Sequence, residues 1–154
     1  MIIWGMASYT ENRKARFNYE ILEKYEAGIE LLGTEVKSVR NSQISLEGAF
    51  VIVRGGEAFL INANIPPFQP KNAPKDYDPL HNRKLLLTKA EIVELAGSEK
   101  NKSLTIVPIS VYNKSRKIKV EIALVKGKKM FDKRKALEKR ETDRSIRRTI
   151  KRGE

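Results

Sequence analysis

The ionisable side chains of this chain offer little for catalysis. His81 is the only histidine among 154 residues and there is no cysteine, which excludes a paired-histidine metal site, a thiol nucleophile and a disulfide. The sequence also lacks the G-x-x-x-x-G-K pattern of a phosphate-binding loop, so nucleotide hydrolysis is not expected. We interpret His81 as a surface loop residue or an RNA contact rather than a general base, and we predict no catalytic residue, no metal site and no cofactor.

Glutamates between residues 20 and 35 are the one group that could in principle hold Mg²⁺ for a nuclease. Acidic residues in strands and turns are far more common than nuclease sites, so a metal-dependent nuclease is a minor alternative. The glutamates are Glu20, Glu23, Glu26, Glu30 and Glu35.

Cationic side chains dominate the rest of the sequence. The net charge is +12, and residues 126–154 hold 13 Lys and Arg against 5 Asp and Glu. The apolar residues of this segment are too few for a core, so we expect it to gain structure only against a strong polyanion such as RNA. If this segment were helical, several cations would lie along one side of the helix and repel each other. Binding to RNA phosphates would remove that repulsion, so we expect a tail that is disordered alone and helical on RNA. These cations are Arg140, Arg144, Arg147 and Lys151, with Arg148 beside them.

The body carries further basic clusters, some with an aromatic residue nearby. Phe17 follows residues 12–16, and Phe131 follows the basic run 126–129, so either ring could stack on a base. Each cluster alone is usually a solvated face, but several on one small domain favour a shared RNA surface. The clusters are Arg13, Lys14 and Arg16; Arg83 and Lys84; Lys114, Arg116, Lys117 and Lys119; and Lys126, Gly127, Lys128 and Lys129.

Strands dominate the expected body. Turn-forming residues separate short apolar or alternating runs, which is typical of antiparallel strands. Gly55 and Gly56 fall between two such runs and predict a tight hairpin, because both can take positive φ. Residues 26–28 are likewise interpreted as a turn. The expected strands are residues 19–25, 29–32, 50–53, 58–61, 85–87, 104–111 and 117–125, and we expect the short apolar strand 85–87 to be buried.

Two helices and one long loop complete the pattern. Thr88 and Glu91 have the spacing of a capping box, and Gly97 suits the end of the helix that they begin. Residues 34–43 favour a second, short helix. Five of the six prolines lie in residues 66–79, where the missing amide donors predict an extended surface loop.

The order of these elements predicts a mainly β fold. Residues 117–125 alternate between apolar and charged side chains, as expected of a half-buried strand. Six or so strands with few helices indicate a small antiparallel barrel of the OB kind, although a sandwich would give a similar pattern. We expect an N-terminal arm at 1–11, the barrel with flanking helices at 12–125 and a basic C-terminal tail, disordered or helical, at 126–154.

Six ordered stretches together resemble one family. They are residues 12–16, 26–29, 33–40, 83–87, 119–124, and 127–129 with 132–134. In this order and spacing they resemble the SsrA-binding protein (small protein B) family, the bacterial partner of transfer-messenger RNA, from about Asn12 to the end of the chain.

The resemblance implies an RNA-binding protein that is not an enzyme. Such a protein binds the tRNA-like domain of transfer-messenger RNA and delivers that RNA to stalled ribosomes for trans-translation. The tail would enter the decoding centre and message channel of the small subunit. The implied partners are transfer-messenger RNA and the ribosome, with no membrane, no small-molecule substrate and a cytoplasmic location. A constitutive OB-fold ribosomal protein with a basic extension is the alternative.

The resemblance also implies which residues contact RNA. Glu26 cannot attract phosphate, but its carboxylate can accept hydrogen bonds from base amino or imino groups. The implied RNA-binding residues are Asn12, Arg13, Lys14, Arg16, Phe17, Glu26, Lys37, Arg83, Lys84, Leu86, Lys119, Lys126, Gly127, Lys128 and Lys129. The implied ribosome-binding residues are Phe131, Asp132, Lys133, Arg134, Arg140, Arg144, Arg147, Arg148 and Lys151.

This chain departs from the family pattern at three positions. Phe17 stands where the family often has histidine. Phe131 stands where the family often has histidine or tyrosine. His81 stands where arginine is common. We therefore expect ring stacking rather than side-chain hydrogen bonding at Phe17 and Phe131.

Overall fold

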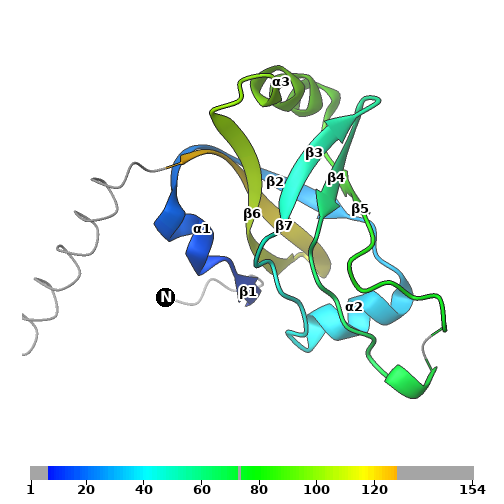
Figure 1. Ribbon diagram of the computed structural model, residues 1–154. Helices are drawn as coiled ribbons and strands as arrows, with labels where there is room; N and C mark the ends of the chain where they lie inside the picture. The colour runs from blue at the N-terminus through cyan, green and yellow to red at the C-terminus, as the bar shows by residue number, and fades with distance from the viewer. Residues whose placement is uncertain (1–6, 73, 128–154) are drawn as a thin grey trace, which may run out of the picture.

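A computed structural model of the protein describes residues 7–72 and 74–127, and its strands curve around a common centre (Figure 1). Within those residues the chain forms seven strands, three α-helices and one 3₁₀ turn. In chain order they are β1 (Ala7–Glu11), α1 (Arg13–Asn18), β2 (Tyr19–Ile29), α2 (Gly33–Arg40), β3 (Phe50–Arg54), β4 (Glu57–Ile61), η1 (Pro70–Asn72), β5 (Arg83–Leu86), α3 (Lys89–Glu99), β6 (Leu104–Lys114) and β7 (Lys117–Gly127). None of the described helices is long and apolar enough to cross a membrane.

The strands close into a ring. Their order is β1-β6-β3-β4-β5-β2-β7, and β7 also pairs with β6, while every pairing is antiparallel. The pairings β2–β7 and β6–β7 are the longest, so this side of the barrel has the most extensive strand pairing. On the other side, β3 meets β6 at a single registered pair among the described residues, Val51 with Ile106. The predicted small antiparallel barrel is confirmed.

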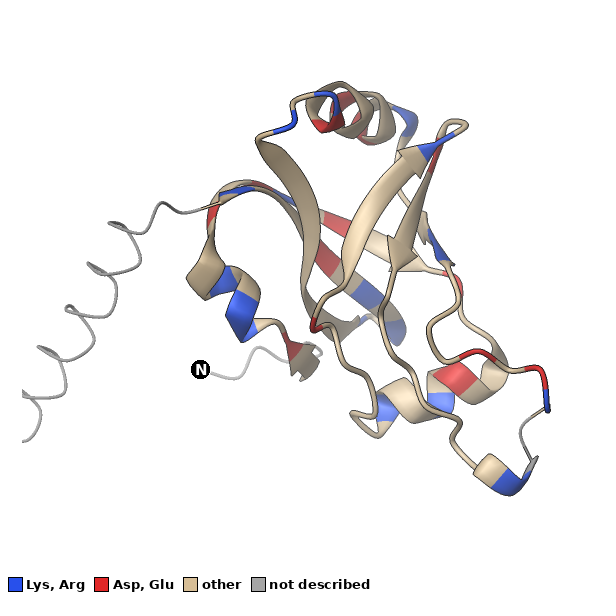
Figure 2. Cartoon of the chain, viewed as in Figure 1, with Lys and Arg blue, Asp and Glu red and all other residues tan. Residues whose placement is uncertain are grey.

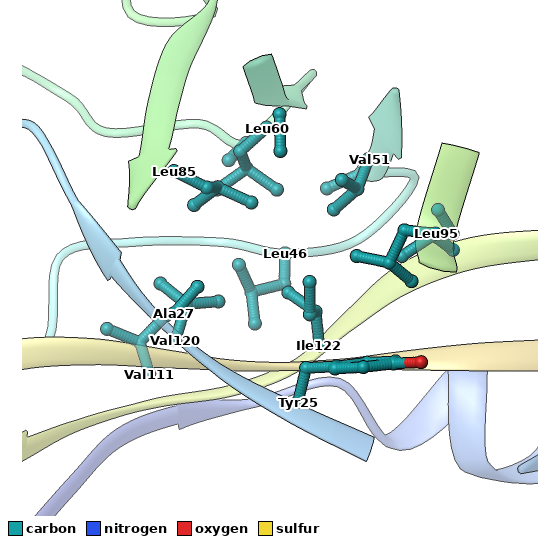
Figure 3. Packing of buried hydrophobic residues seen from close by; sticks show 14 of the residues in the cluster. Tyr25, Ala27, Leu46, Val51, Leu60, Leu85, Leu95, Val111, Val120 and Ile122 are labelled. Atoms are coloured by element: carbon teal, nitrogen blue, oxygen red, sulfur yellow. The ribbon is translucent and has the colours of Figure 1, made fainter. Parts of the chain in front are cut away.

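The core fills the centre of the barrel. Val120, Ile122 and Leu124 alternate along β7 and point inward, as the sequence pattern predicted. They share one core cluster with Leu60 of β4 and Leu95 of α3, and Figure 3 shows Ile122, Leu60 and Leu95 within the same packed interior. Burial of these side chains supplies the main driving force for folding.

Several local predictions are confirmed. Gly55 and Gly56 both have positive φ (+61° and +74°) in the β3–β4 turn. Thr88 caps α3 and forms the capping box with Glu91. The proline-rich stretch is mostly a loop, as predicted, with one short 3₁₀ turn at its centre.

Three local predictions are wrong. Residues 26–28 are not a turn, because β2 runs through them and pairs with both β5 and β7. Gly97 does not end α3, which continues to Glu99. Leu86 is not buried with its neighbour Leu85, because strand alternation turns it outward and leaves it 50 % exposed.

The two ends of the chain bear on the expected domain boundaries. Residues 7–11 lie within the expected N-terminal arm, yet they form β1 and pair with β6. β7 continues two residues beyond 125 and ends at Gly127. Residues 128–154, which make up most of the expected tail, lie outside the described residues, so the division into arm, barrel and tail stays a prediction.

Candidate RNA interface

Strand register places several of the predicted contacts on one side of the barrel. Residues directly opposite each other on neighbouring antiparallel strands point to the same face. Lys119 of β7 lies opposite Gly28 of β2 and Tyr112 of β6, while Glu121 lies opposite Glu26. Because the flanking residues of β7 point into the core, these five residues share the opposite side. We call this side of β2, β7 and β6 the outer face.

Helix α1 packs on this outer face. Ala15 is buried against Val107, Ile109, Ala123 and Val125, which form a small second apolar cluster. The packing leaves the cations of α1 exposed beside the sheet, and Figure 2 shows basic positions both on α1 and on β7. The exposed cations are Arg13, Lys14 and Arg16, and Lys14 is paired with Glu47. Phe17 follows them, half-buried.

Asn12 fixes where α1 begins. Its side-chain oxygen accepts from the Ala15 amide (3.2 Å), and its side-chain nitrogen donates to the carbonyls of Pro108 (3.0 Å) and Leu46 (3.4 Å). The side chain is buried, so both ends of its amide are already engaged by the protein. Asn12 thus orients the basic helix, and its predicted direct contact with RNA stays a prediction.

Glu26 is held across β7 by residues of β6. Tyr112 Oη donates to Glu26 at 2.6 Å, and Lys114 Nζ lies 3.2 Å from both carboxylate oxygens. The hydrogen bond from Tyr112, together with the bond and charge of Lys114, outweighs burial and lowers the pKa of Glu26. Burial and then the Glu26 carboxylate raise the pKa of Tyr112. Glu26 is therefore an ionised, oriented acceptor with one side open to solvent.

A groove lies where β2, β5 and the β6–β7 turn meet. Its floor is apolar, built from Gly28 and the exposed side chain of Leu86 with neighbours from β2 and α2. A side chain in place of Gly28 would come within 3.2 Å of Leu86 Cβ, which is tighter than most such contacts, so Leu86 would have to shift by a few tenths of an ångström. The groove is rimmed by cations, which are Arg40, Arg116, Lys117 and Lys119. The arrangement suits a polyanion that also offers an apolar or aromatic surface.

Arg83 is already engaged within the protein, so its predicted contact with RNA stays a prediction that its burial disfavours. Its guanidinium is completely buried and forms an ion pair with Glu35, to which Nε donates at 2.8 Å. Its other donors reach the carbonyls of Ala63 (2.8 Å) and Pro79 (2.9 Å). The strand period explains this burial: Arg83 points inward with Leu85, whereas its neighbours at 84 and 86 do not.

The remaining predicted contacts differ in their surroundings. Lys84 is partly exposed and lies 3.2 Å from Glu57, and Lys37 is exposed on α2. Lys126 is exposed opposite Glu20, near the start of β2, which directly follows α1. A side chain at Gly127 would meet nothing within 4 Å, so nothing in its surroundings requires glycine.

The other predicted site residues, all in the tail, lie outside the described residues. They are Lys128, Lys129, Phe131, Asp132, Lys133, Arg134, Arg140, Arg144, Arg147, Arg148 and Lys151.

Some residues of the interface were missed from sequence. Tyr112 lies in a nearly continuous apolar run of β6 and looks like an ordinary core aromatic. Arg40 ends α2 and donates to the carbonyl of Arg116 at 3.0 Å, which joins the helix to the β6–β7 turn. Only the pairing of distant strands brings these residues to Glu26 and Leu86, and no local pattern encodes that pairing.

The glutamates considered for a nuclease do not gather. Burial raises the pKa of Glu35, but the amide of Leu32 and then the bonds and charge of Arg83, with His81, outweigh it and lower that pKa. His81 Nε2 lies 2.8 Å from this carboxylate, so His81 belongs to the same buried network. Within residues 7–72 and 74–127, no group of acidic or histidine side chains could hold a metal ion.

The closed barrel, its basic helix and the cation-rimmed groove define a small basic β-barrel protein whose surface suits a polyanion. A model of the SmpB protein family matches residues 9–152. A relative called SsrA-binding protein in Gloeothece citriformis is 49 % identical, and the match covers 93 % of this chain and 92 % of that protein. A relative of the same name in Enterococcus faecalis is 50 % identical, and the match covers 92 % of this chain and 91 % of that protein. The chain belongs to the SmpB family.

A solved structure is also similar to this chain. It is described as "tmRNA-SmpB: a journey to the center of the bacterial ribosome". The similarity covers 79 % of this chain and 85 % of that one, with 46 % identity and a TM-score of 0.66. The resemblance expected from the six sequence stretches is therefore confirmed at the level of both family and fold.

Proposed function

We propose that this protein binds the tRNA-like domain of transfer-messenger RNA and delivers that RNA to stalled ribosomes in trans-translation. The observation that carries the proposal is the shared surface. Strand register and α1 bring the 12–16 cluster, Glu26 and Lys119 to one outer face, bordered by the Leu86 groove. Family membership supplies the identity of the RNA.

The outer face offers three kinds of contact. Exposed cations on α1 and along the groove neutralise phosphates, which supplies affinity without sequence preference. Glu26 accepts hydrogen bonds from base edges, and Leu86 gives an apolar contact. Lys117 and Lys119 of β7 lie on this face by strand alternation, whereas Lys126, seven residues from Lys119, points to the other side of the strand. A long, folded RNA fits this surface better than a small ligand does.

The tail has a separate role in this proposal. Phe131 to Arg134 and the downstream arginines engage the decoding centre and message channel of the small subunit. The protein acts by binding rather than by catalysis, and it works in the cytoplasm, where ribosomes translate.

One experiment tests binding to RNA. The full chain is titrated with a labelled transcript of the tRNA-like domain at several salt concentrations. If six to eight phosphates are engaged, log affinity falls against log salt with a slope of about −4 to −7. A slope near zero contradicts the proposal. Recovery in stoichiometric amounts with salt-washed ribosomes from unstressed cells, and not with transfer-messenger RNA, favours the constitutive ribosomal protein instead.

A second experiment separates the barrel from the tail. A chain that ends after residue 130 should bind the isolated RNA with an affinity close to that of the full chain. It should fail to support tagging of peptides on ribosomes stalled in a purified translation system. Equal loss of both activities would contradict two separable surfaces.

A further inference from the structure

A buried ion pair anchors the proline-rich loop, residues 66–79. Glu35 and Arg83 lie beneath it, both fully buried. Removing such a pair from water carries a large desolvation penalty, and an apolar pair of similar volume is often at least as stable. Arg83 donates to the carbonyl of Pro79 at the end of the loop as well as to Glu35. The pair thus fixes the loop to the barrel.

Further hydrogen bonds hold the loop near both ends. Ser38 of α2 donates to the carbonyl of Pro66 at 2.8 Å. Tyr77 Oη donates to the carbonyl of Ile65 at 2.7 Å and lies 3.1 Å from the Glu35 carboxylate. A loop anchored in this way presents its exposed side chains in a fixed geometry, which is how binding sites are preorganised.

Phe68 is the aromatic side chain that this loop presents. It is half-buried and borders two neighbouring hollows. One hollow opens toward α2, and the other opens toward the segment before β3. The first is lined by Thr34, Lys37, Pro67, Gln69, Pro74 and Tyr77, and the second by Gln43, Ile44, Ser45, Asn64, Pro66, Pro67 and Pro70. An aromatic ring beside such hollows offers a stacking platform.

Lys37 supplies a positive charge beside the ring. Its Nζ lies 6.0 Å from the centre of the Phe68 ring, at the outer limit of a cation–π contact. In the described part of the chain, no carboxylate lies within salt-bridge distance of Lys37. An ammonium next to an aromatic face matches the two parts of a nucleotide, its phosphate and its base.

Helix α2 connects this site with the outer-face groove. Thr34 and Lys37 line the first Phe68 hollow, whereas Val36 and Arg40 line the groove that also holds Leu86. A helix with its side chains is about 10 Å across. One RNA strand can therefore contact the groove on one side of α2 and Phe68 on the other.

We propose that Phe68 and Lys37 form a second RNA subsite, which takes one unstacked nucleobase of the tRNA-like domain. The base stacks on Phe68 and the neighbouring phosphate lies at Lys37. The occupant is RNA because Lys37 has no carboxylate partner among the described residues, because the site lies across one helix from the groove, and because the chain has a net charge of +12. This inference rests on the proposed function.

The test compares substitutions that remove either the ring or the charge. Phe68→Ala and Phe68→Leu should each weaken binding of the labelled tRNA-like domain by about 5- to 150-fold, as expected for loss of one base–aromatic stack. Neither variant should change the salt slope, because no charge is lost. Phe68→Trp should retain the affinity. Lys37→Gln should make the slope less steep by about 0.7 to 0.9. Thermal unfolding followed by circular dichroism checks that each variant is folded.

Two results would overturn the subsite. If the parent chain binds the RNA and Phe68→Leu binds within twofold of it, the nucleobase proposal fails while the proposed function stands. If the parent chain itself does not bind, the proposed function fails. A photo-crosslinking residue at position 68 should attach to the RNA. Attachment to a ribosomal protein, with RNA affinity unchanged in Phe68→Leu, would show that the ring docks against protein.

Discussion

Replacing Arg83 by methionine should destabilise the barrel strongly. The substitution keeps much of the aliphatic volume but removes both hydrogen bonds to Glu35 and those to the carbonyls of Ala63 and Pro79. A buried carboxylate without its cation costs about 3–5 kcal/mol. Domains of this size have a total unfolding free energy of about 5–15 kcal/mol, so the loss is a large share.

The adjacent position gives a matched control. Lys84→Met removes the same charge one residue away, but Lys84 is partly exposed and paired with Glu57 at 3.2 Å. An exposed ion pair contributes about 0.2–1 kcal/mol. Urea unfolding of both variants, followed by circular dichroism, should therefore separate them by at least about 2 kcal/mol. A double-mutant cycle with Glu35→Gln isolates the coupling between Arg83 and Glu35.

The pH dependence supplies a second readout. In the parent chain, folding lowers the pKa of Glu35. The ionised carboxylate therefore contributes to the free energy of unfolding above its unfolded pKa of about 4.3. That contribution is lost as the pH falls through the lower folded pKa. Without Arg83, burial raises that pKa instead, and the variant gains relative stability in acid. The gap between Arg83→Met and the parent should shrink below about pH 4.5. A loss under 1 kcal/mol, or a gap independent of pH, would refute the reasoning.

Three further substitutions test the outer face. Gly28→Ala places a methyl 3.2 Å from Leu86 Cβ. Urea unfolding should show that the free energy of unfolding falls by about 1–3 kcal/mol, and RNA affinity should fall as well. Parental values for both would contradict the groove geometry. Tyr112→Phe removes the main hydrogen bond to Glu26, and an NMR titration should show the pKa of Glu26 rising toward its ordinary value; an unchanged pKa would contradict that contact. Asn12→Ala removes the cap of α1 and should cost about 1–2 kcal/mol, with faster amide exchange across the helix; unchanged exchange would mean that the cap does not hold α1.

The elements that could be predicted are those with a strong local signal. The β7 alternation, the Gly55-Gly56 turn and the Thr88 capping box each result from steric or hydrogen-bonding rules that act within a few residues. The barrel then follows, because several alternating strands in a short chain must bury one face together. The order of those strands around the ring could not be read from local patterns.

The errors arise where a distant strand decides the role of a residue. Gly28 looks like part of a turn, but its missing side chain admits Leu86 from β5, which lies 58 positions along the chain. Arg83 and Lys84 look alike in sequence, yet one points inward to a buried carboxylate and the other outward. The basic clusters could be found from sequence, whereas Tyr112 as the support of Glu26 required the fold.

The narrow seam between β3 and β6 affects how the barrel moves. Among the residues that the structure describes, Val51 and Ile106 are the one registered pair there, so this joint has far fewer backbone hydrogen bonds than the β2–β7 and β6–β7 joints. Transient opening starts where a structure has the fewest such bonds. The barrel should therefore open first between β3 and β6, while the longer β2–β7 and β6–β7 pairings stay formed. Because α1 packs on Val107 and Ile109 of β6, next to this joint, such an opening would shift the basic helix relative to Glu26.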